Sequence, residues 1–213
     1  MSDFQAEVAR IALQAAAEHG FALGGGQALV AHGVVHRPTE DIDLFTDADG
    51  GVQAASEPVA AALSNVGMAV SSMPDDTELG EMFDGFENDF AEFEVHRGDD
   101  VVRLTLARFD RHLVPVEMDL GPVLHLDDVI GSKVAAMATR AEPRDFVDVA
   151  AALKSFTRER LLALAWTSDP ALTDEELRES MRALDDLPDM AFLQWVEPDR
   201  VAGMRARFVD WPR

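Results

Sequence analysis

The chain contains no cysteine. This absence excludes disulfide bridges, thiolate zinc sites and a thiol nucleophile, and it is typical of a protein in a reducing compartment. No apolar run approaches the roughly 18 residues that a membrane helix needs, and the first residues lack the basic start of a signal peptide. We therefore expect a cytoplasmic protein without a membrane-spanning segment.

Basic residues are scarce, because 18 Lys and Arg stand against 40 Asp and Glu, for a formal net charge of -22. Residues 38–96 contain neither Lys nor Arg, whereas residues 97–160 contain ten of the 18. Such a charge opposes nonspecific binding to nucleic acid or anionic membranes. Because charges are largely screened beyond about 8 Å in physiological salt, a local cluster of basic residues can still bind phosphates on an acidic protein. The length of 213 residues and the 47% hydrophobic composition predict one globular domain, or one domain with a helical appendage.

Three glycines, Gly24 to Gly26, separate two segments with different patterns. An apolar run at residues 21–23 predicts a short strand, and residues 27–32 predict a helix. Glycine at such a junction allows a sharp turn and the close approach of a ligand, and the first amides of a helix favour an anion. A plain turn without a ligand explains the glycines equally well on their own.

A pair of carboxylates follows at Asp41 and Asp43. Side chains alternate along a strand, so Ile42 and Leu44 are expected in the core and both aspartates on the opposite face. Carboxylates about 7 Å apart on one face can share one or two hard cations. Their mutual repulsion in a half-buried site requires a cation or an arginine nearby.

A third carboxylate is a candidate for the same site. Residues 114–120 alternate between apolar and other residues, which predicts a strand with Glu117 and Asp119 on its non-core face. If this strand lies beside the one that carries Asp41 and Asp43, Asp119 completes a set of three acids that can hold two cations. Ordinary solvation of a polar strand face is the alternative.

Beyond residue 121 the pattern is mainly helical. One predicted helix carries Lys133 and Arg140 on nearly one face, because they are seven residues apart. Pro143 suits the first turn of the next helix, on which Asp145 and Asp148 share a face. The two cations could bind phosphates while the acids orient them, or the four charges could simply pair on a surface.

From about residue 20 to residue 153, these segments resemble the minimal nucleotidyltransferases of the DNA polymerase β superfamily. They resemble most closely the AbiEii/AbiGii group, which includes type IV toxins and MenT-like toxins. The four family motifs match, in order, residues 25–29 with 37–45, then Asp119, then Lys133 with Arg140, and finally residues 144–148.

The resemblance implies an α+β fold, with a mixed sheet and flanking helices over residues 1–122 and a helical region, residues 123–213, that closes the nucleotide cleft. It implies transfer of NMP from an NTP to an acceptor by in-line attack on the α-phosphate, with release of pyrophosphate. The implied residues are Asp41, Asp43 and Asp119 for two Mg²⁺ ions, Gly25, Gly26, Arg37, Thr39, Lys133 and Arg140 for the triphosphate, and Asp145, Arg144 and Asp148 as catalytic or supporting charges.

Three hypotheses for the function remain open at this point. In the toxin relatives the implied acceptor is RNA, in particular a tRNA end, and a nearby gene is expected to encode an antitoxin; the net charge of -22 weakens this analogy. A transferase of the same fold that modifies an aminoglycoside-like small molecule is the second hypothesis. A noncatalytic protein that binds a nucleotide is the third. The three acids and Lys133 favour an active enzyme.

Overall fold

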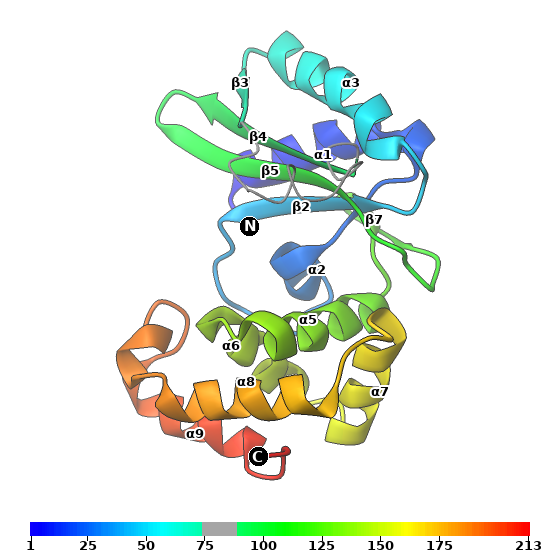
Figure 1. Cartoon of the computed structure of the whole chain (residues 1–213). Helices are drawn as coiled ribbons and strands as arrows, with labels where there is room; N and C mark the ends of the chain where they lie inside the picture. Colours follow the sequence, from blue (N-terminus) through cyan, green and yellow to red (C-terminus); the bar gives the residue numbers. More distant parts are fainter. Residues whose placement is uncertain (74–88) are drawn as a thin grey trace. The chain divides into compact units, whose positions relative to one another are not determined.

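A computed structural model of the chain describes residues 1–73 and 89–213. The fold is α+β, as predicted, with a mixed sheet and flanking helices (Figure 1). The chain divides into two compact units: unit 1 comprises residues 1–31 and 39–125, and unit 2 comprises residues 32–38 and 126–213. The domain boundary expected at residue 122 stays a prediction. Nearly all of the acidic segment 74–90 lies outside the described residues.

Unit 1 contains all the strands of the described residues. Its helices are α1 (Asp3–Ala15), the 3₁₀ turn η1 (Ala17–His19), α2 (Gly25–Ala31) and α3 (Gly51–Asn65). Its strands are β1 (Ala22–Leu23), β2 (Asp41–Thr46), β3 (Ala69–Ser72), β4 (Phe90–Arg97), β5 (Asp100–Arg108), β6 (Val116–Met118) and β7 (Gly121–Val123). They form one sheet in the order β3-β4-β5-β2-β1-β7-β6.

The central strand of this sheet is β2, which pairs in parallel with β5 and antiparallel with β1. Ile42 and Leu44 of β2 are fully buried. The helix α1 packs against β1 and β2, and α3 packs against β3, β4 and β5 (Figure 1). Because side chains alternate along β2, Asp41 and Asp43 lie on the face opposite to Ile42 and Leu44.

Local sequence signals begin and end several of these elements. Ser2 Oγ accepts a hydrogen bond from the Gln5 backbone over 3.2 Å, and the Gln5 side chain accepts from the Ser2 backbone over 2.8 Å, so a capping box starts α1. Gly20 ends η1 in the left-handed conformation, at φ 66°. Gly98, at φ 62°, turns the chain between the antiparallel strands β4 and β5.

Unit 2 is helical. It contains α5 (Leu126–Arg140), α6 (Pro143–Ala152), α7 (Arg158–Ser168), α8 (Asp174–Asp186) and α9 (Val201–Arg205), with 3₁₀ turns at η3 (Asp189–Phe192), η4 (Pro198–Arg200) and η5 (Ala206–Phe208). As predicted, Pro143 occupies the first turn of α6. Phe146 and Phe208 pack edge to face in its core, with ring centroids 5.9 Å apart. Within the described residues, no helix has the length and apolar character to cross a membrane.

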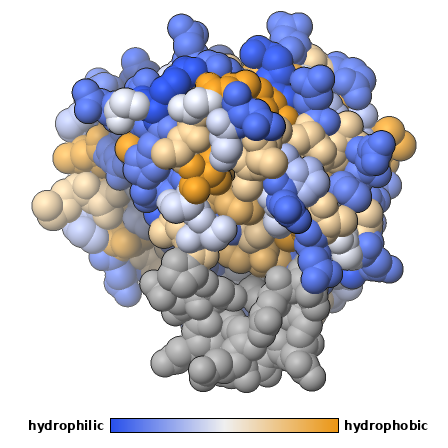
Figure 2. Space-filling model, turned by 90° about the horizontal axis from the view of Figure 1, so that it is seen from above, coloured by the Kyte–Doolittle hydropathy of each residue, from blue (hydrophilic) through white to orange (hydrophobic). Residues whose placement is uncertain are grey.

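The hydropathy of the surface is uneven. Figure 2 views the molecule from above, the side on which α3 lies in Figure 1, and apolar surface occupies the middle of this face with hydrophilic surface around it. The helix α3 contains a single charged residue, Glu57, and exposes Ala54, Pro58 and Ala61. The strong negative charge of the chain is therefore concentrated away from this helix.

Candidate active site

The glycine turn and the aspartate strand meet within unit 1. After β1, the backbone N–H of Gly24 donates to the carbonyl of Asp43 over 2.8 Å. A Cβ on Gly24 would lie 2.2 Å from the ring of Phe45, so the close approach of the two segments requires glycine here. The helix α2 begins at Gly25, two residues earlier than predicted, so that Gly25 and Gly26 lie in its first turn.

The side chain of Asp43 lies directly against Gly25. A Cβ on Gly25 would stand 1.8 Å from Oδ2 of Asp43 and 2.8 Å from its Cγ. The backbone of Gly25 is also left-handed, at φ 55°. Glycine is therefore required at this position for two independent reasons, space and backbone conformation. The result is a carboxylate held at the glycine turn, where the sequence analysis expected phosphate and metal chemistry.

Asp41 and Asp43 project from the face of β2 that the alternation predicts. Both are partly exposed, whereas Ile42 between them is fully buried. Residues two apart on a strand are separated by about 7 Å. In proteins, Mg²⁺ usually takes one or two carboxylates and completes its coordination with water and substrate phosphates. This pair of hard oxygen donors therefore fits Mg²⁺ bound together with a triphosphate.

Thr39 lies two residues before Asp41 and is 9% exposed. Its carbonyl accepts a hydrogen bond from Nε2 of Gln5 over 2.7 Å, which ties the segment before β2 to α1. The hydroxyl of Thr39 is buried and has no hydrogen-bond partner among the described residues. This segment thus brings an unsatisfied polar group to the start of the aspartate strand.

Polar residues of the neighbouring strands share the open face, and the sequence analysis missed them. The register sets Arg103 of β5 opposite Asp41 and Thr105 opposite Asp43. Glu92 of β4 lies opposite Thr105, and its Oε1 is 3.4 Å from Nε of Arg103. The alternation of polar and apolar residues in β4 and β5 was the available signal. The pairing of β5 with β2 could not be inferred from either strand alone.

The strand that carries the third acid does not lie beside β2. The strand at residues 114–120 is shorter than predicted, and it turns at Asp119 into β7, a strand that was not predicted. In the sheet, β1 and β7 lie between β6 and β2. Among the residues that the structure describes, no group of three or more His, Cys, Asp or Glu could hold a metal ion. We build the proposed metal site on Asp41 and Asp43, and the role of Asp119 as a third metal ligand stays a prediction.

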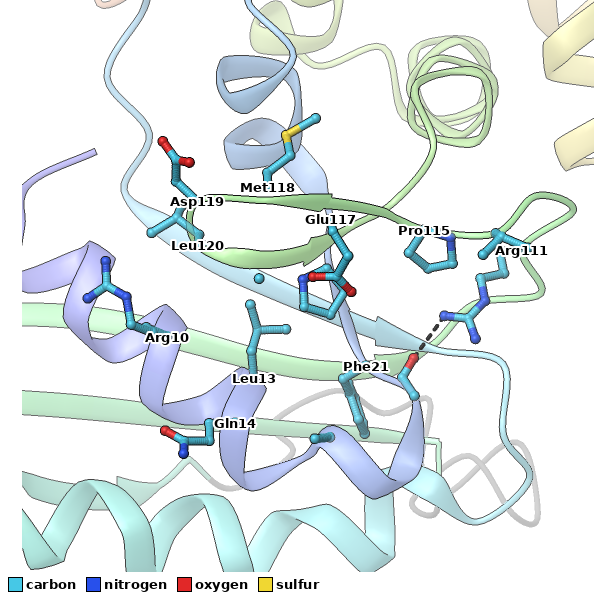
Figure 3. A pocket seen from close by; sticks show the side chains of 15 residues that line it. Arg10, Leu13, Gln14, Phe21, Arg111, Pro115, Glu117, Met118, Asp119 and Leu120 are labelled. Carbon is cyan, nitrogen blue, oxygen red and sulfur yellow. Dashed lines mark hydrogen bonds between the residues drawn. The ribbon is translucent and has the colours of Figure 1, made fainter.

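Asp119 lines a separate cavity of about 710 Å³ in unit 1 (Figure 3). Side chains of α1, including Arg10 and Leu13, form one wall, and the β6–β7 hairpin forms another. Arg111 and Gly20 also line the cavity, and Nη1 of Arg111 donates to the carbonyl of Gly20 over 2.8 Å. The side chain of Asp119 points away from α1 in Figure 3.

Unit 2 contains the second group of candidate site residues. The buried carboxylate of Asp148 accepts two hydrogen bonds from Arg37, from Nε to Oδ1 and from Nη2 to Oδ2, both of 2.7 Å. Such a bidentate pair fixes the plane of the guanidinium group. Nζ of Lys133 lies 3.2 Å from Asp148 and 3.5 Å from Asp145. Asp148 therefore positions Arg37, the residue that the resemblance assigns to the triphosphate.

Asp145 holds Arg140 in the same way. Nε and Nη2 of Arg140 donate to its two oxygens over 2.8 and 2.9 Å. Asp145 is fully buried, whereas the side chain of Arg140 is 42% exposed. Arg144, the other cation of this motif, pairs with Glu142 over 2.8 Å. The two cations Lys133 and Arg140 thus reach one shared carboxylate.

Cations and carboxylates lie together in this group of unit 2. Arg37, Lys133 and Arg140 lie against Asp145 and Asp148, and Glu142 lies 4.0 Å from Nε of Arg140. Buried carboxylates require such compensation. A planar guanidinium and a compact ammonium are both good partners for a phosphate.

Comparison with known families identifies one match. A profile described as "Nucleotidyl transferase AbiEii toxin, Type IV TA system" matches residues 8–196. This range contains every residue of the two groups described above. No match was found among curated proteins.

Solved structures share the fold at low sequence identity. MenT4, a nucleotidyltransferase toxin from Mycobacterium tuberculosis, is 15% identical, with a TM-score of 0.61 over 97% of this chain and 82% of that one. JHP933 from Helicobacter pylori is 15% identical, with a TM-score of 0.58 over 97% and 91% of the two chains. A putative nucleotidyltransferase from H. pylori is 16% identical, with a TM-score of 0.57 over 97% and 94%. These likenesses establish the fold.

Proposed function

Because the chain belongs to the AbiEii family of nucleotidyl transferase toxins of type IV toxin–antitoxin systems, we propose that it transfers a nucleoside monophosphate from an NTP to RNA. The proposed acceptor is a tRNA end, the cofactor is Mg²⁺ and the second product is pyrophosphate. Membership of a toxin–antitoxin family also implies a cognate antitoxin.

The observation that carries this proposal is the contact of Asp43 with the glycine turn. The carboxylate lies against Gly25, where a Cβ would be 1.8 Å from Oδ2, and Asp41 projects from the same face of β2. Bound at these two carboxylates with the triphosphate, Mg²⁺ would neutralise phosphate charge and favour ionisation of the attacking hydroxyl. Gly26 and Thr39, which lie between Gly25 and Asp43 in the sequence, supply further polar groups for the nucleotide.

The cations of unit 2 have the second role in the proposal. Lys133, Arg140 and Arg37 neutralise the triphosphate and the leaving pyrophosphate. Asp145 and Asp148 are positioning residues, because each accepts a bidentate pair of hydrogen bonds from an arginine and thereby fixes its orientation. Catalysis then consists mainly of positioning and charge neutralisation.

The reaction replaces a phosphoanhydride bond of the NTP by a phosphodiester bond to the acceptor. An oxygen of the acceptor hydroxyl attacks the α-phosphorus and forms the new bond, while the bond from the α-phosphorus to the bridging oxygen breaks. Pyrophosphate leaves with that oxygen, and the hydroxyl proton is released to water.

Incubation of the protein with each of the four α-labelled NTPs and total cellular RNA tests the proposal. Label should enter RNA with one or more NTPs in the presence of Mg²⁺, should stop with EDTA, and should resume when Mg²⁺ is restored in excess. Size fractionation identifies the labelled RNA, and sequencing of its ends locates the added nucleotide. If no NTP releases pyrophosphate with any RNA, the proposal is wrong.

A small cationic acceptor is a second candidate, and the open face of the sheet favours it. Glu92 and Glu94 lie on this face, with Glu94 opposite Arg103 and Arg103 opposite Asp41. Carboxylates repel RNA phosphates and attract amines. A panel of aminocyclitols in the same assay distinguishes the candidates, because labelled aminocyclitol without labelled RNA would replace the first proposal by the second.

A further inference from the structure

Two residues of unit 1 bury polar side-chain atoms that have no hydrogen-bond partner among the described residues. They are Gln27, in which both Nε2 and Oε1 are unsatisfied, and Thr39, in which the hydroxyl is unsatisfied. Gln27 is fully buried. Because buried polar groups are nearly always hydrogen-bonded in native proteins, each such exception requires an explanation.

The positions of Gln27 and Thr39 suggest an explanation for their unsatisfied polar atoms. Gln27 follows Gly25 by two residues on α2, a helix that packs against β2. Thr39 precedes Asp41 by two residues, and its backbone is held by Gln5. Both unsatisfied side chains therefore belong to the two short segments that meet where Asp43 contacts Gly25.

The chemistry of the amide limits what can satisfy Gln27. Nε2 is a donor and requires an acceptor, whereas Oε1 is an acceptor and requires a donor. Phosphate oxygens that carry no proton only accept, so a triphosphate can satisfy Nε2 but leaves Oε1 unsatisfied. Ribose hydroxyls and the edges of the bases offer both a donor and an acceptor.

We infer that Gln27 binds the nucleoside part of the NTP and helps to determine which nucleotide the protein accepts. This inference rests on the proposed function, because it assigns the ligand to the same site. A leucine of similar size would bury its side chain without an unsatisfied group. The amide is therefore retained for the ligand rather than for the fold.

Calorimetric titration of Gln27→Leu tests the inference, with Mg²⁺ present and with ATP, CTP, GTP, UTP, the matching dNTPs and inorganic triphosphate as ligands. The variant should unfold at the same temperature as the wild type or at a higher one. Its affinity for the preferred NTP should fall about 10-fold, whereas its affinity for triphosphate should not change. If ribose is the group bound, the wild type prefers the NTP to its dNTP and the variant loses this preference; a preference that persists in the variant assigns the contact to the base.

Gln53→Leu is the matched control, since Gln53 is exposed on α3. It should bind every ligand like the wild type. Equal affinity of wild type and Gln27→Leu for all NTPs overturns the inference, and so does an equal loss for NTPs and triphosphate. These outcomes leave the proposed function intact if the wild type still labels RNA. Conversely, selective weakening in Gln27→Leu without any transfer by the wild type would refute the proposed function alone.

Discussion

Unit 1 and unit 2 each present a pair of aspartates, and the two pairs differ in burial and in their partners. Asp41 and Asp43 are two residues apart on a strand and partly exposed, and Asp43 lies against a glycine backbone. Asp145 and Asp148 of α6 are three residues apart on a helix and are 0% and 1% exposed. Each accepts a bidentate pair from an arginine, and Lys133 lies within 3.5 Å of both.

The difference shows that the same side chain can serve opposite purposes. When both oxygens of a carboxylate accept hydrogen bonds from an arginine, the carboxylate is compensated without a metal ion. Its removal leaves cations uncompensated. A carboxylate at the open face of a sheet can bind a cation together with a substrate. We therefore expect changes in the unit 1 pair to reduce activity, and changes in the unit 2 pair to reduce stability as well.

The largest expected effect is the loss of activity in Asp43→Asn. Replacing a carboxylate that is proposed to hold the metal ion at the triphosphate should lower the rate of nucleotidyl transfer by about 1,000-fold. The free energy of unfolding should change by less than about 1 kcal/mol, because the side chain is partly exposed. Transfer of labelled NMP and urea denaturation measure the two quantities. Full activity in this variant would remove the basis of the metal assignment.

Asp148→Asn should reduce stability as well as activity. Removing one partner of a buried ion pair should lower the free energy of unfolding by about 3 kcal/mol. Glu142→Gln is the control, because this carboxylate is 44% exposed where it pairs with Arg144, and its loss should cost less than about 1 kcal/mol. Urea denaturation of the three proteins provides the comparison. Similar stability of Asp148→Asn and wild type would contradict the structural role of this aspartate.

Gly25→Ala tests how the position of Asp43 is determined. The new Cβ must displace the carboxylate, and a misplacement of about 1 Å should reduce transfer by about 100-fold. Gly33→Ala is the matched control, because Gly33 also has a positive φ, of 71°, but no atom lies within 4 Å of an added Cβ. Both variants carry similar backbone strain, so their free energies of unfolding should fall by similar amounts. Only Gly25→Ala should also lower the rate of transfer by the folded protein. Equal activity of the two would show that contact with Gly25 is dispensable.

Asp119→Asn should have the smallest effect. Since β1 and β7 lie between its strand and β2, transfer should remain within about 2-fold of the wild-type rate. Kinetic measurement at saturating NTP and Mg²⁺ checks this expectation. A loss comparable to that of Asp43→Asn would instead make Asp119 the third metal ligand and restore the interpretation based on the family motif.

The sequence was sufficient for the features that depend on local periodicity. The alternation around Ile42 predicted which face of β2 carries the aspartates, and Pro143 predicted the start of a helix. Seven-residue spacing also predicted a common face for Lys133 and Arg140, which both reach Asp145. In each case a repeat of 2.0 or 3.6 residues determines the direction of the side chain.

Features that depend on strand order or on long-range pairing could not be predicted from the sequence. The alternating pattern of residues 114–120 contains no information about which strand lies beside it, so the sequence could not show that β1 and β7 separate this strand from β2. Arg37 and Asp148 are separated by 111 positions, and no local pattern connects them. The burial of Gln27 likewise follows from packing rather than from its place in α2.

The parallel pairing of β2 with β5 also affects when the site is formed during synthesis. Parallel strands require a long connection, and Arg103 follows its partner Asp41 by about 60 residues. At translation rates of about 5 to 20 residues per second, β2 waits roughly 3 to 12 s for this neighbour. A nascent chain should therefore complete the sheet around the proposed metal-binding strand late, and a ribosome-bound fragment that ends before β5 should be inactive in nucleotidyl transfer.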